Sequence, residues 1–364
     1  MVDVLVIGAG MSGLVCARQL MRAGLDVVVL EKSAGVGGRM ATRRITPSPG
    51  EAAVIVDHGA QYLTTDTDAL HRLLKEWLTL GLVVEWTRAL HILDETGLHP
   101  DSVERHHPRY VCPAGMTAIA KYLADALTIH TQTKVVGIHL APMGWQVTTE
   151  QGTRYTAANL VMALPAPQVL ELLAELLTEA SAAMKGLLDS ATYLPCLAVM
   201  AGYPLTTPLP SWKGICCQGD EKLAWIALDS SKRPQPASPV VVLHASPEFS
   251  AQHLEKDTEQ LQAVGSQLLK HAAQRLDPWL RTPVWMQVHR WRYALPEESV
   301  GMASLATRMS GGGSQTFPLI CAGDWCGGGK IEGAWLSGHD AAEQLLYELG
   351  IHTIPSRFSP AGAS

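Results

Sequence analysis

Three glycines near the start of the chain have a spacing that suits a bound phosphate group. Gly8, Gly10 and Gly13 form a Gly-x-Gly-x-x-Gly pattern directly after the apolar run at residues 2–7. The first glycine permits a tight turn, the second lets a pyrophosphate approach the backbone, and the third lets a helix pack closely. The free amides and positive dipole at the start of that helix would hold the anion. The pattern therefore predicts a dinucleotide-binding site.

An acidic residue follows where a ribose would need a hydrogen-bond acceptor. Glu31 comes directly after the apolar run at residues 27–30, and residues 12–24 between the two apolar runs have helical spacing. A strand, a helix, a second strand and a terminal acid are the parts of a dinucleotide-binding βαβ unit. The alternative is a glycine-rich turn in a βαβ unit that binds no nucleotide.

A second pair of glycines lies just behind this acid. Gly37 and Gly38 permit another close backbone approach, and Arg39 adds a charge that is not lost at any ordinary pH. The segment resembles the Gly-Gly-Arg segment of the flavin-containing amine oxidase superfamily, where it contacts the FAD pyrophosphate. The resemblance implies FAD as the cofactor.

Two further segments suit the flavin end of such a cofactor. Gly323 and Asp324 close an apolar run, so the carboxylate could reach the ribityl chain or the pyrophosphate, and a helix expected from about Gly333 could aim its amides at the flavin O2 edge. Earlier in the chain, a short strand leads into Gly59–Tyr62. A close-approach glycine followed by polar and aromatic side chains suits a flat heterocycle.

Composition limits the class of protein. The 364 residues are 47% hydrophobic and 17% charged, which is ordinary for a globular chain of two domains. A net charge of −6 without a basic stripe argues against nucleic acid and against an anionic membrane surface. No apolar run reaches the roughly 18 residues of a membrane span. The histidines at 106 and 107 lack further ligands at suitable spacing, so no metal site is expected.

Cysteine usage and the start of the chain indicate a compartment. Seven cysteines occur without any Cys-x-x-Cys spacing, which favours a reducing environment over a disulfide framework. The first predicted strand begins at residue 2 and leaves no room for a signal peptide. We expect a cytoplasmic protein that does not associate with membranes.

The remaining apolar patterns predict two kinds of region. Helices are expected at 70–82, at about 115–127, at 169–188 and at 254–276, and strands at 134–138, 144–148, 159–165, 196–201, 223–228, 240–245 and 284–293. The expected FAD-binding domain comprises residues 1–70, 105–165 and 290–350. The expected α+β substrate domain comprises residues 71–104 and 166–289, and residues 351–364 form a tail.

Taken together, the chain resembles the bacterial branch of the renalase family over nearly its whole length. The segments that carry this resemblance are Gly8–Gly13, Gly38–Met40, Gly59–Tyr62, Gly115–Met116, Pro165–Pro167, Leu243–Ala245, His289–Trp291, Gly323–Cys326 and Glu332–Gly338. The first and last are general to FAD-binding amine oxidases, and the internal ones narrow the resemblance. It implies an α/β fold, with a Rossmann-like domain of the glutathione-reductase type and an inserted substrate domain like that of p-hydroxybenzoate hydroxylase.

The resemblance also implies an activity and a set of cofactor contacts. Renalases oxidise misreduced 2- or 6-dihydro isomers of NAD(P)H to NAD(P)+, with hydride transfer to flavin N5 and reoxidation by O2 to give H2O2. The implied FAD contacts are Gly8, Gly10, Met11, Ser12, Gly13, Glu31, Lys32, Gly38, Arg39, Met40, Gly59, Ala60, Gln61, Tyr62, Val135, Ala163, Gly323, Asp324, Gly333 and Ala334. Residues 295–320 contain no cysteine for covalent attachment, so dissociable FAD is expected.

Candidate substrate contacts are mainly aromatic. Tyr62 and Trp335 could stack on a planar ring, or could be packing aromatics. His244 could contact substrate, although a core histidine is the commoner explanation. Arg292 could hold a substrate phosphate or be solvated, and Trp291 is its neighbour on the same predicted strand.

Other functions remain open from the sequence. An amine oxidase would need an aromatic cage for its amine, and ten tryptophans make one possible. A flavin-binding redox sensor without turnover is a third interpretation. A monooxygenase is less favoured because no separate NADPH motif is found.

Overall fold

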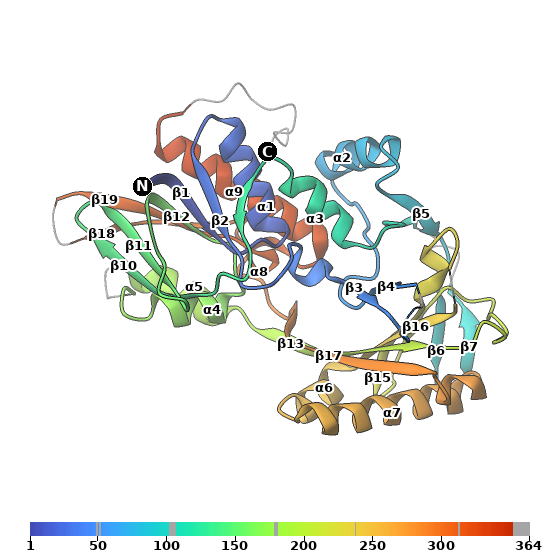
Figure 1. Ribbon diagram of the computed structural model, residues 1–364. Coiled ribbons are helices and arrows are strands. Elements are labelled where there is room, and N and C mark those ends of the chain that lie inside the picture. Colours follow the sequence, from blue (N-terminus) through green and yellow to red (C-terminus); the bar gives the residue numbers. More distant parts are fainter. Residues whose placement is uncertain are drawn as a thin grey trace.

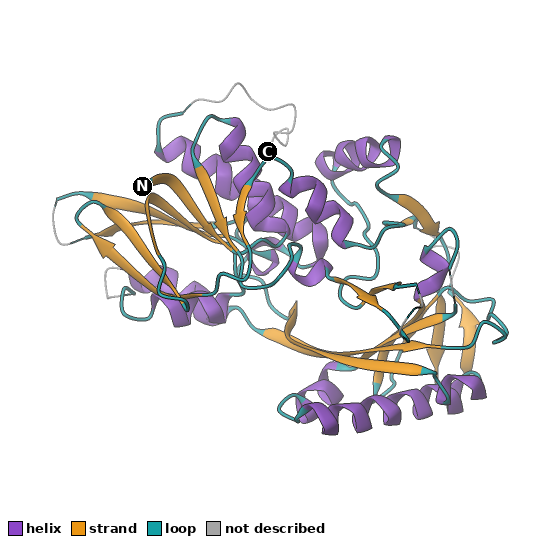
Figure 2. Cartoon of the chain, viewed as in Figure 1, coloured by secondary structure: helices purple, strands orange, loops and turns teal. Residues whose placement is uncertain are grey.

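Two β-sheets, each packed against helices, make up the molecule (Figure 1). The computed structural model describes residues 1–48, 50, 52–101, 107–177, 181–236, 238–311 and 314–351. The tail expected at 351–364 lies outside this description from residue 352 onward, as does His106. Figure 2 shows the two sheets in different parts of the molecule, each with helices beside it.

The first sheet has eight strands and carries the N-terminal βαβ unit. Its path runs β10-β11-β12-β1-β2-β9, with β19 beside β12 and β18 beside β19. The strands are β1 (Val2–Ile7), β2 (Val27–Leu30), β9 (Thr128–His130), β10 (Val135–Ala141), β11 (Gly144–Thr149), β12 (Arg154–Met162), β18 (Leu305–Ser310) and β19 (Thr316–Cys321). Because β1 is parallel to β2 and β12, and β12 is parallel to β19, four carboxyl ends meet at one edge. Ligands of open α/β sheets bind at such an edge.

Helices cover both faces of this sheet, which explains why β1 is apolar at successive positions. Val4 and Val6 pack with α1 (Met11–Arg22), α3 (Thr117–Ala124) and α9 (Lys330–Glu348), whereas Leu5 and Ile7 pack with α4 (Ala166–Leu173) and α5 (Ala182–Ser190). A strand buried on both faces needs this continuous apolar run. The arrangement confirms an α/β unit.

The second sheet has seven strands and is mostly antiparallel. Its order is β17-β13-β16-β15-β14-β6-β7. The strands are β6 (His91–Asp94), β7 (Gly97–Pro100), β13 (Tyr193–Gly202), β14 (Gly214–Cys217), β15 (Leu223–Leu228), β16 (Val240–Ala245) and β17 (Trp285–Pro296). The helix α7 (Thr258–Arg275) runs along one face, with α6 (Pro247–His253) beside it (Figure 1). The opposite, inner face is turned toward the rest of the chain.

Smaller elements connect the sheets. The hairpin of β3 (Thr42–Ile45) and β4 (Val54–Asp57) packs Ile45 and Val56 on Met200 and Val242 of the inner face. The remaining described elements are α2 (Asp68–Thr79), β5 (Val84–Thr87), β8 (Arg109–Val111), α8 (Asp324–Gly327) and the short helices η1 (Gly38–Met40), η4 (Asp229–Lys232) and η5 (Pro278–Arg281).

Four sequence expectations differ from the structure in their bounds. The helix expected at 254–276 is α7, which begins only at Thr258, because Asp257 caps it with a capping box to Gln260; α6 ends before the expected range, at His253. The helical spacing at 169–188 divides into α4 and α5. The helix expected from about Gly333 already begins at Lys330. The domain boundary expected at residue 290 falls within β17.

Candidate cofactor and substrate site

The first glycine loop has no room for a side chain at Gly8 and Gly13, but has free space beside Gly10. Gly8 has a φ of +104°, and a Cβ there would lie 2.5 Å from the carbonyl oxygen of Ala163. A Cβ on Gly13 would lie 2.0 Å from the carbonyl oxygen of Gly8. A Cβ on Gly10 would meet no atom within 4 Å. The backbone at Gly10 is therefore free for the approach of a phosphate, as the glycine pattern predicts.

The second glycine loop faces the first. The Gly37 amide donates to the Ala9 carbonyl at 2.8 Å. Gly38 has a φ of +52°, and a Cβ built on it would lie 3.4 Å from the Gly10 Cα. Positive φ in both glycines of this pair explains why no other residue type suits the turn. The two loops together form a cradle of backbone at the carboxyl edge of the first sheet.

The acid behind β2 is held by backbone amides. Glu31 is 7% exposed, and its carboxylate accepts hydrogen bonds from the Ala9 amide at 2.8 Å and the Ser33 amide at 2.7 Å. Each carboxylate oxygen keeps a further lone pair for a ribose hydroxyl. Lys32 is exposed beside it. A buried acid next to an open glycine loop fits the ribose and pyrophosphate of a dinucleotide.

An ion pair joins the second glycine loop to the C-terminal part of the chain. The Arg39 guanidinium binds both carboxylate oxygens of Asp324, at 2.7 and 2.6 Å. Ala163 follows β12 at the same edge, where its amide donates to the Ile7 carbonyl. The expected cofactor residues from four distant segments thus lie along one edge of the sheet.

The start of α9 approaches α1 through small residues. A Cβ on Gly338 would lie 2.3 Å from the Ser12 carbonyl oxygen, so the two helices cross in close contact. Glu332 in the first turn of α9 accepts hydrogen bonds from the amides of Asp66 and Thr67 at 2.9 and 2.8 Å. Trp335 is buried in the core of the first sheet. Its ring also contacts that of His339, with centroids 5.4 Å apart.

The segment from His58 to Tyr62 crosses the inner face of the second sheet. At one end, the Trp291 indole donates to the His58 carbonyl at 2.9 Å, and the two rings stack with centroids 5.4 Å apart. At the other end, the ring centroids of Tyr62 and Trp225 are 5.6 Å apart. Gly59 has no room for a side chain, because a Cβ would lie 2.0 Å from the Arg39 carbonyl oxygen. The segment therefore lies between the glycine loops and the second sheet.

Beneath this segment runs a row of opposed residues from four strands. Trp225 on β15 is opposite His244 on β16, His244 is opposite Ala198 on β13, and Ala198 is opposite His289 on β17. Directly opposed residues point to one face of a sheet. His289 contacts the His58 ring at 4.7 Å, so this is the inner face.

The histidines of this region are held neutral. Burial, with smaller contributions from the neighbouring His289 and Arg43, lowers the pKa of His58 to about 3. Burial together with Lys232 lowers the pKa of His244 to about 4, and burial together with Arg43 and Arg290 lowers that of His289 to about 4. Desolvation disfavours the charged imidazolium.

A buried cluster of charges, missed by the sequence analysis, joins η4 to β4. Arg233 binds Asp57 at 2.7 Å and Asp229 at 3.2 Å, and Lys232 binds Asp229 at 2.8 Å. Lys232 also donates to the Gln61 side chain at 3.0 Å. Burial opposes ionisation of Asp57, but Lys232 and Arg233 outweigh it and lower the pKa of this carboxyl. Gln61, in the middle of the segment expected to face a flavin, is thus held by Lys232 and by the backbone carbonyls of Asp57 and Gly59, to which its side chain donates.

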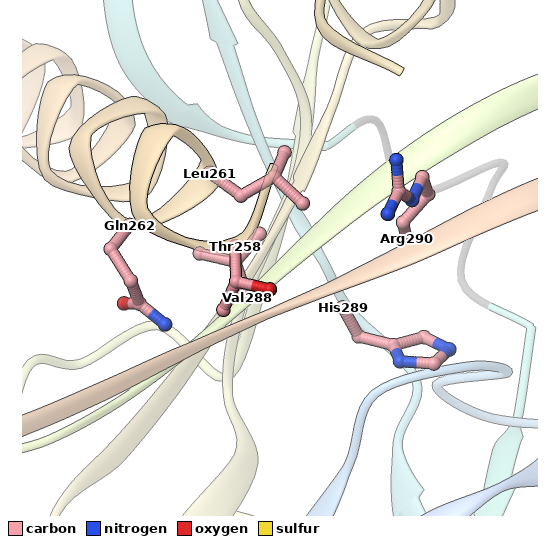
Figure 3. Close-up of a pocket in the computed structure, with 6 residues that line it drawn as sticks. All are labelled: Thr258, Leu261, Gln262, Val288, His289 and Arg290. Atoms are coloured by element: carbon pink, nitrogen blue, oxygen red, sulfur yellow. The ribbon is translucent and has the colours of Figure 1, made fainter. Parts of the chain in front are cut away.

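Arg292 lies away from this region. It pairs with Glu255, in the connection between α6 and α7, at 2.5 Å. A cavity of about 240 Å³ lies on the same outer side, between α7 and β17. Figure 3 shows Leu261 and Thr258 of α7 at this cavity, while the His289 side chain extends away from the helix. The cavity is therefore separate from the glycine loops.

Other ligand types find little support. Among the described residues, no group of three or more His, Cys, Asp or Glu side chains could hold a metal ion. In the same part of the chain, no helix is both long enough and apolar enough to cross a membrane.

Comparisons with known proteins agree with this geometry. A family model described as flavin containing amine oxidoreductase matches residues 98–346, and one described as an NAD(P)-binding Rossmann-like domain matches residues 6–77. The chain belongs to the flavin containing amine oxidoreductase family. It is an FAD-dependent oxidoreductase.

The chain is also similar to individual proteins of known name. Renalase of Mus musculus is 28% identical over 309 residues, which cover 82% of this chain and 86% of that protein. Coproporphyrinogen III oxidase of Mycobacterium tuberculosis is 28% identical over 190 residues, covering 51% of this chain and 39% of that protein. The fold is similar to that of cyclohexylamine oxidase from Brevibacterium oxydans, with a TM-score of 0.67, 14% identity and coverage of 96% and 99%.

Proposed function

We propose that this protein is a renalase-type oxidase, which converts 2- or 6-dihydro isomers of NAD(P)H to NAD(P)+. The observation that carries the proposal is the likeness to mouse renalase, because it extends over 82% of this chain and so spans both sheets. FAD, when bound, supplies the hydride acceptor at N5 and passes the electrons to O2 to give H2O2. The dinucleotide substrate and O2 are the proposed partners.

The cofactor would lie along the carboxyl edge of the first sheet. The open backbone at Gly10 and the amide-held carboxylate of Glu31 suit the pyrophosphate and the adenosine ribose. Val135, the first residue of β10, would lie near the adenine. The flavin end would reach Gly59 and the start of α9. We extend the proposal to all the FAD contacts that the family resemblance implies, and to a dissociable cofactor.

The finer architecture is part of the same proposal. The first sheet with its helices would be an FAD-binding unit of the glutathione-reductase type, and the second sheet a substrate unit like that of p-hydroxybenzoate hydroxylase. This division is supported by the strand pairing, because β13 pairs with β16 and β17, which all belong to the second sheet. All seven cysteines are free thiols, which fits a reducing, cytoplasmic location.

The substrate ring would bind between the flavin and the inner face of the second sheet. The proposed contacts are Tyr62, Trp291 and His244, which lie along the inner face, with Trp291 and Tyr62 at the two ends of the His58–Tyr62 segment. Trp335 is buried, and Arg292 pairs with Glu255 on the outer side. A dihydropyridine gives up hydride without a general base. The residues of the site need only to orient the ring and exclude competing reactions.

A second candidate is a flavin amine oxidase acting on a small amine. It is favoured by a cluster of three aromatic rings. The ring centroids of Trp86 and Trp225 lie 6.3 and 5.6 Å from that of Tyr62. Aromatic faces of this kind can bind an amine. The two candidates differ in the charge of the substrate.

Anaerobic reduction separates the candidates. The FAD-loaded protein is mixed in a stopped-flow instrument with 2-dihydro-NAD(P), 6-dihydro-NAD(P), 4-dihydro-NAD(P) or a panel of primary amines, and the flavin absorption is followed. Fast bleaching by a 2- or 6-dihydro isomer and none by the amines is expected. Bleaching by an amine alone would establish the second candidate, and no bleaching by any compound would indicate a flavin protein without turnover.

A further inference from the structure

The aromatic cluster between the sheets is already occupied by cations of the protein. The Arg109 guanidinium lies over the Tyr62 ring, 5.7 Å from its centroid. The Lys232 ammonium lies over the Trp86 ring, 5.5 Å from its centroid. An aromatic face attracts one cation at this distance. Because Asp229 compensates the charge of Lys232, a substrate ammonium at the Tyr62 ring would meet the Arg109 guanidinium as the uncompensated positive charge.

Among the described residues, the carboxylates near this aromatic cluster are already paired and do not neutralise the charge of Arg109. The carboxylates nearest to the cluster, Asp57 and Asp229, bind Lys232 and Arg233 and are completely buried. Among the described residues, neither Arg43 nor Arg109 forms an ion pair with a carboxylate. Arg109 instead donates to the carbonyls of Arg88 and His107.

Arg43 brings its charge to the end of the histidine row. It is half-buried on β3, donates to the Gln287 side chain at 2.8 Å and contacts His289 Nδ1 at 3.1 Å. The imidazoles of His58, His244 and His289 are neutral around it. They can offer hydrogen bonds to an uncharged polar group without adding charge. Arg43 can bind an anionic group in the fork of its guanidinium.

We propose that the site between the two sheets selects its ligand by charge, accepting a flat ring that is neutral or carries an anionic group and rejecting an ammonium ion. The inference rests on the proposed function, because a dihydronicotinamide ring is neutral and its dinucleotide carries phosphates. It goes further by assigning the selection to Arg109 at the Tyr62 ring and to Arg43 beside the histidines. Like charges brought together in a poorly solvated site repel strongly.

Three probes of the same size test this selection without turnover. Benzoate, benzamide and benzylamine differ in charge but share one ring. The dissociation constant of each is measured at pH 7 from the change that it causes in the absorption of the flavin in the FAD-loaded protein. Benzoate and benzamide are expected to bind at least about tenfold more tightly than benzylamine, which corresponds to about 1.4 kcal/mol. Equal or tighter binding of benzylamine, or binding of none of the three, would overturn the proposal.

One pair of variants locates the charge. Arg43→Gln is expected to weaken benzoate binding about tenfold and to change benzamide binding less than twofold. Arg308→Gln is the matched control, because Arg308 pairs with Glu348 on the exposed surface of the first sheet. Retention of FAD by each variant shows that it is folded. Unchanged benzoate binding in Arg43→Gln would contradict the assignment.

The outcome is separable from that of the proposed function. If no dihydro isomer reduces the flavin but benzoate binds more tightly than benzylamine, the charge selection holds and the renalase-type activity fails. If a 2- or 6-dihydro isomer reduces the flavin but benzylamine binds as tightly as benzoate, the activity holds and the charge selection fails.

Discussion

The cofactor edge of the first sheet and the inner face of the second sheet build their sites from different atoms. At the cofactor edge, backbone groups of Gly8–Gly13 and Gly37–Gly38 form the cradle, and the requirement is space. At the inner face, side chains make the contacts, and the requirement is a balance of buried charge, as in the Asp57 and Lys232 cluster. The first region should therefore be sensitive to added volume and the second to lost charge.

The largest effect is expected at the buried charges. Lys232→Met removes a fully buried cation and leaves Asp57 and Asp229 with Arg233 alone. Removing one partner of a buried ion pair typically costs about 3–5 kcal/mol. Urea denaturation of the FAD-loaded variant should show this loss in the free energy of unfolding.

The exposed pair of Lys134 and Glu150 provides the control. Lys134→Met should lower the free energy of unfolding far less than Lys232→Met does, because both side chains of this pair are more than half exposed and solvent screens their charges. If the Lys232 and Lys134 variants were equally stable, the claim that the inner face is sensitive to the loss of a buried charge would be wrong.

Acid should weaken the inner face through its histidines. The pKa values of His58, His244 and His289 lie at about 3, 4 and 4 in the folded protein, below the ordinary value of 6.5. The unfolded chain therefore binds more protons, and stability is complete above about pH 6.5 and falls toward pH 4. Each histidine contributes at most about 1.4 kcal/mol per pH unit in this window.

Unfolding at pH 7, 6 and 5 measures this dependence. In His58→Phe, the slope of the free energy of unfolding against pH should decrease by the contribution of about one proton. The aromatic ring and its stacking on Trp291 are kept, but the titrating group is lost. A slope identical to that of the unmodified protein would show that His58 is not held neutral.

Adding a methyl group should have different effects at Gly13 and at Gly10 of the first loop. Gly13→Ala places a methyl group against the Gly8 carbonyl and should lower the free energy of unfolding by about 1–3 kcal/mol. Gly10→Ala meets no atom and should leave the apoprotein nearly as stable, while weakening FAD binding at least about tenfold.

A helix glycine far from the loop serves as the reference. Gly186→Ala in α5 also meets no atom and should stabilise the protein by about 0.5–1 kcal/mol without changing FAD affinity. Equilibrium dialysis gives the affinity and urea denaturation the stability. Equal FAD affinity in the Gly10 and Gly186 variants would argue against the cradle.

The smallest effect is expected where a single hydrogen bond joins the two regions. Trp291→Phe keeps the stacking on His58 but removes the donor to its carbonyl. The loss should cost about 1 kcal/mol and shift the flavin absorption, since the carbonyl adjoins Gly59. Trp145→Phe, far from the site, loses a comparable bond to Pro318 and should leave the spectrum unchanged.

The same difference explains what the sequence could predict. The glycine loops and Glu31 follow local rules of backbone conformation, so their spacing alone indicated the βαβ unit and a dinucleotide, whereas FAD followed only from the family resemblance. The sequence analysis assigned Arg39 and Asp324 each to the cofactor and did not predict the ion pair that joins the two residues directly. The cluster of Asp57, Lys232 and Arg233 could not be predicted, because about 175 residues separate its partners and the pairing depends on the register of two sheets.

The outer position of Arg292 has a similar cause. Alternation along β17 places neighbouring residues on opposite faces, but only the assembled structure shows which face is covered by α7. Here His289 and Trp291 lie on the inner face and Arg292 on the outer one.

The most direct test of the central claim is a single turnover with a defined stoichiometry. The FAD-loaded protein is mixed anaerobically with an equimolar amount of 2-dihydro-NAD, the loss of flavin absorption and the NAD+ formed are measured, and O2 is then admitted. The account predicts one NAD+ for each flavin bleached and one H2O2 for each flavin restored. Bleaching without NAD+, or no bleaching by either the 2- or the 6-dihydro isomer in protein that an amine does reduce, would contradict it.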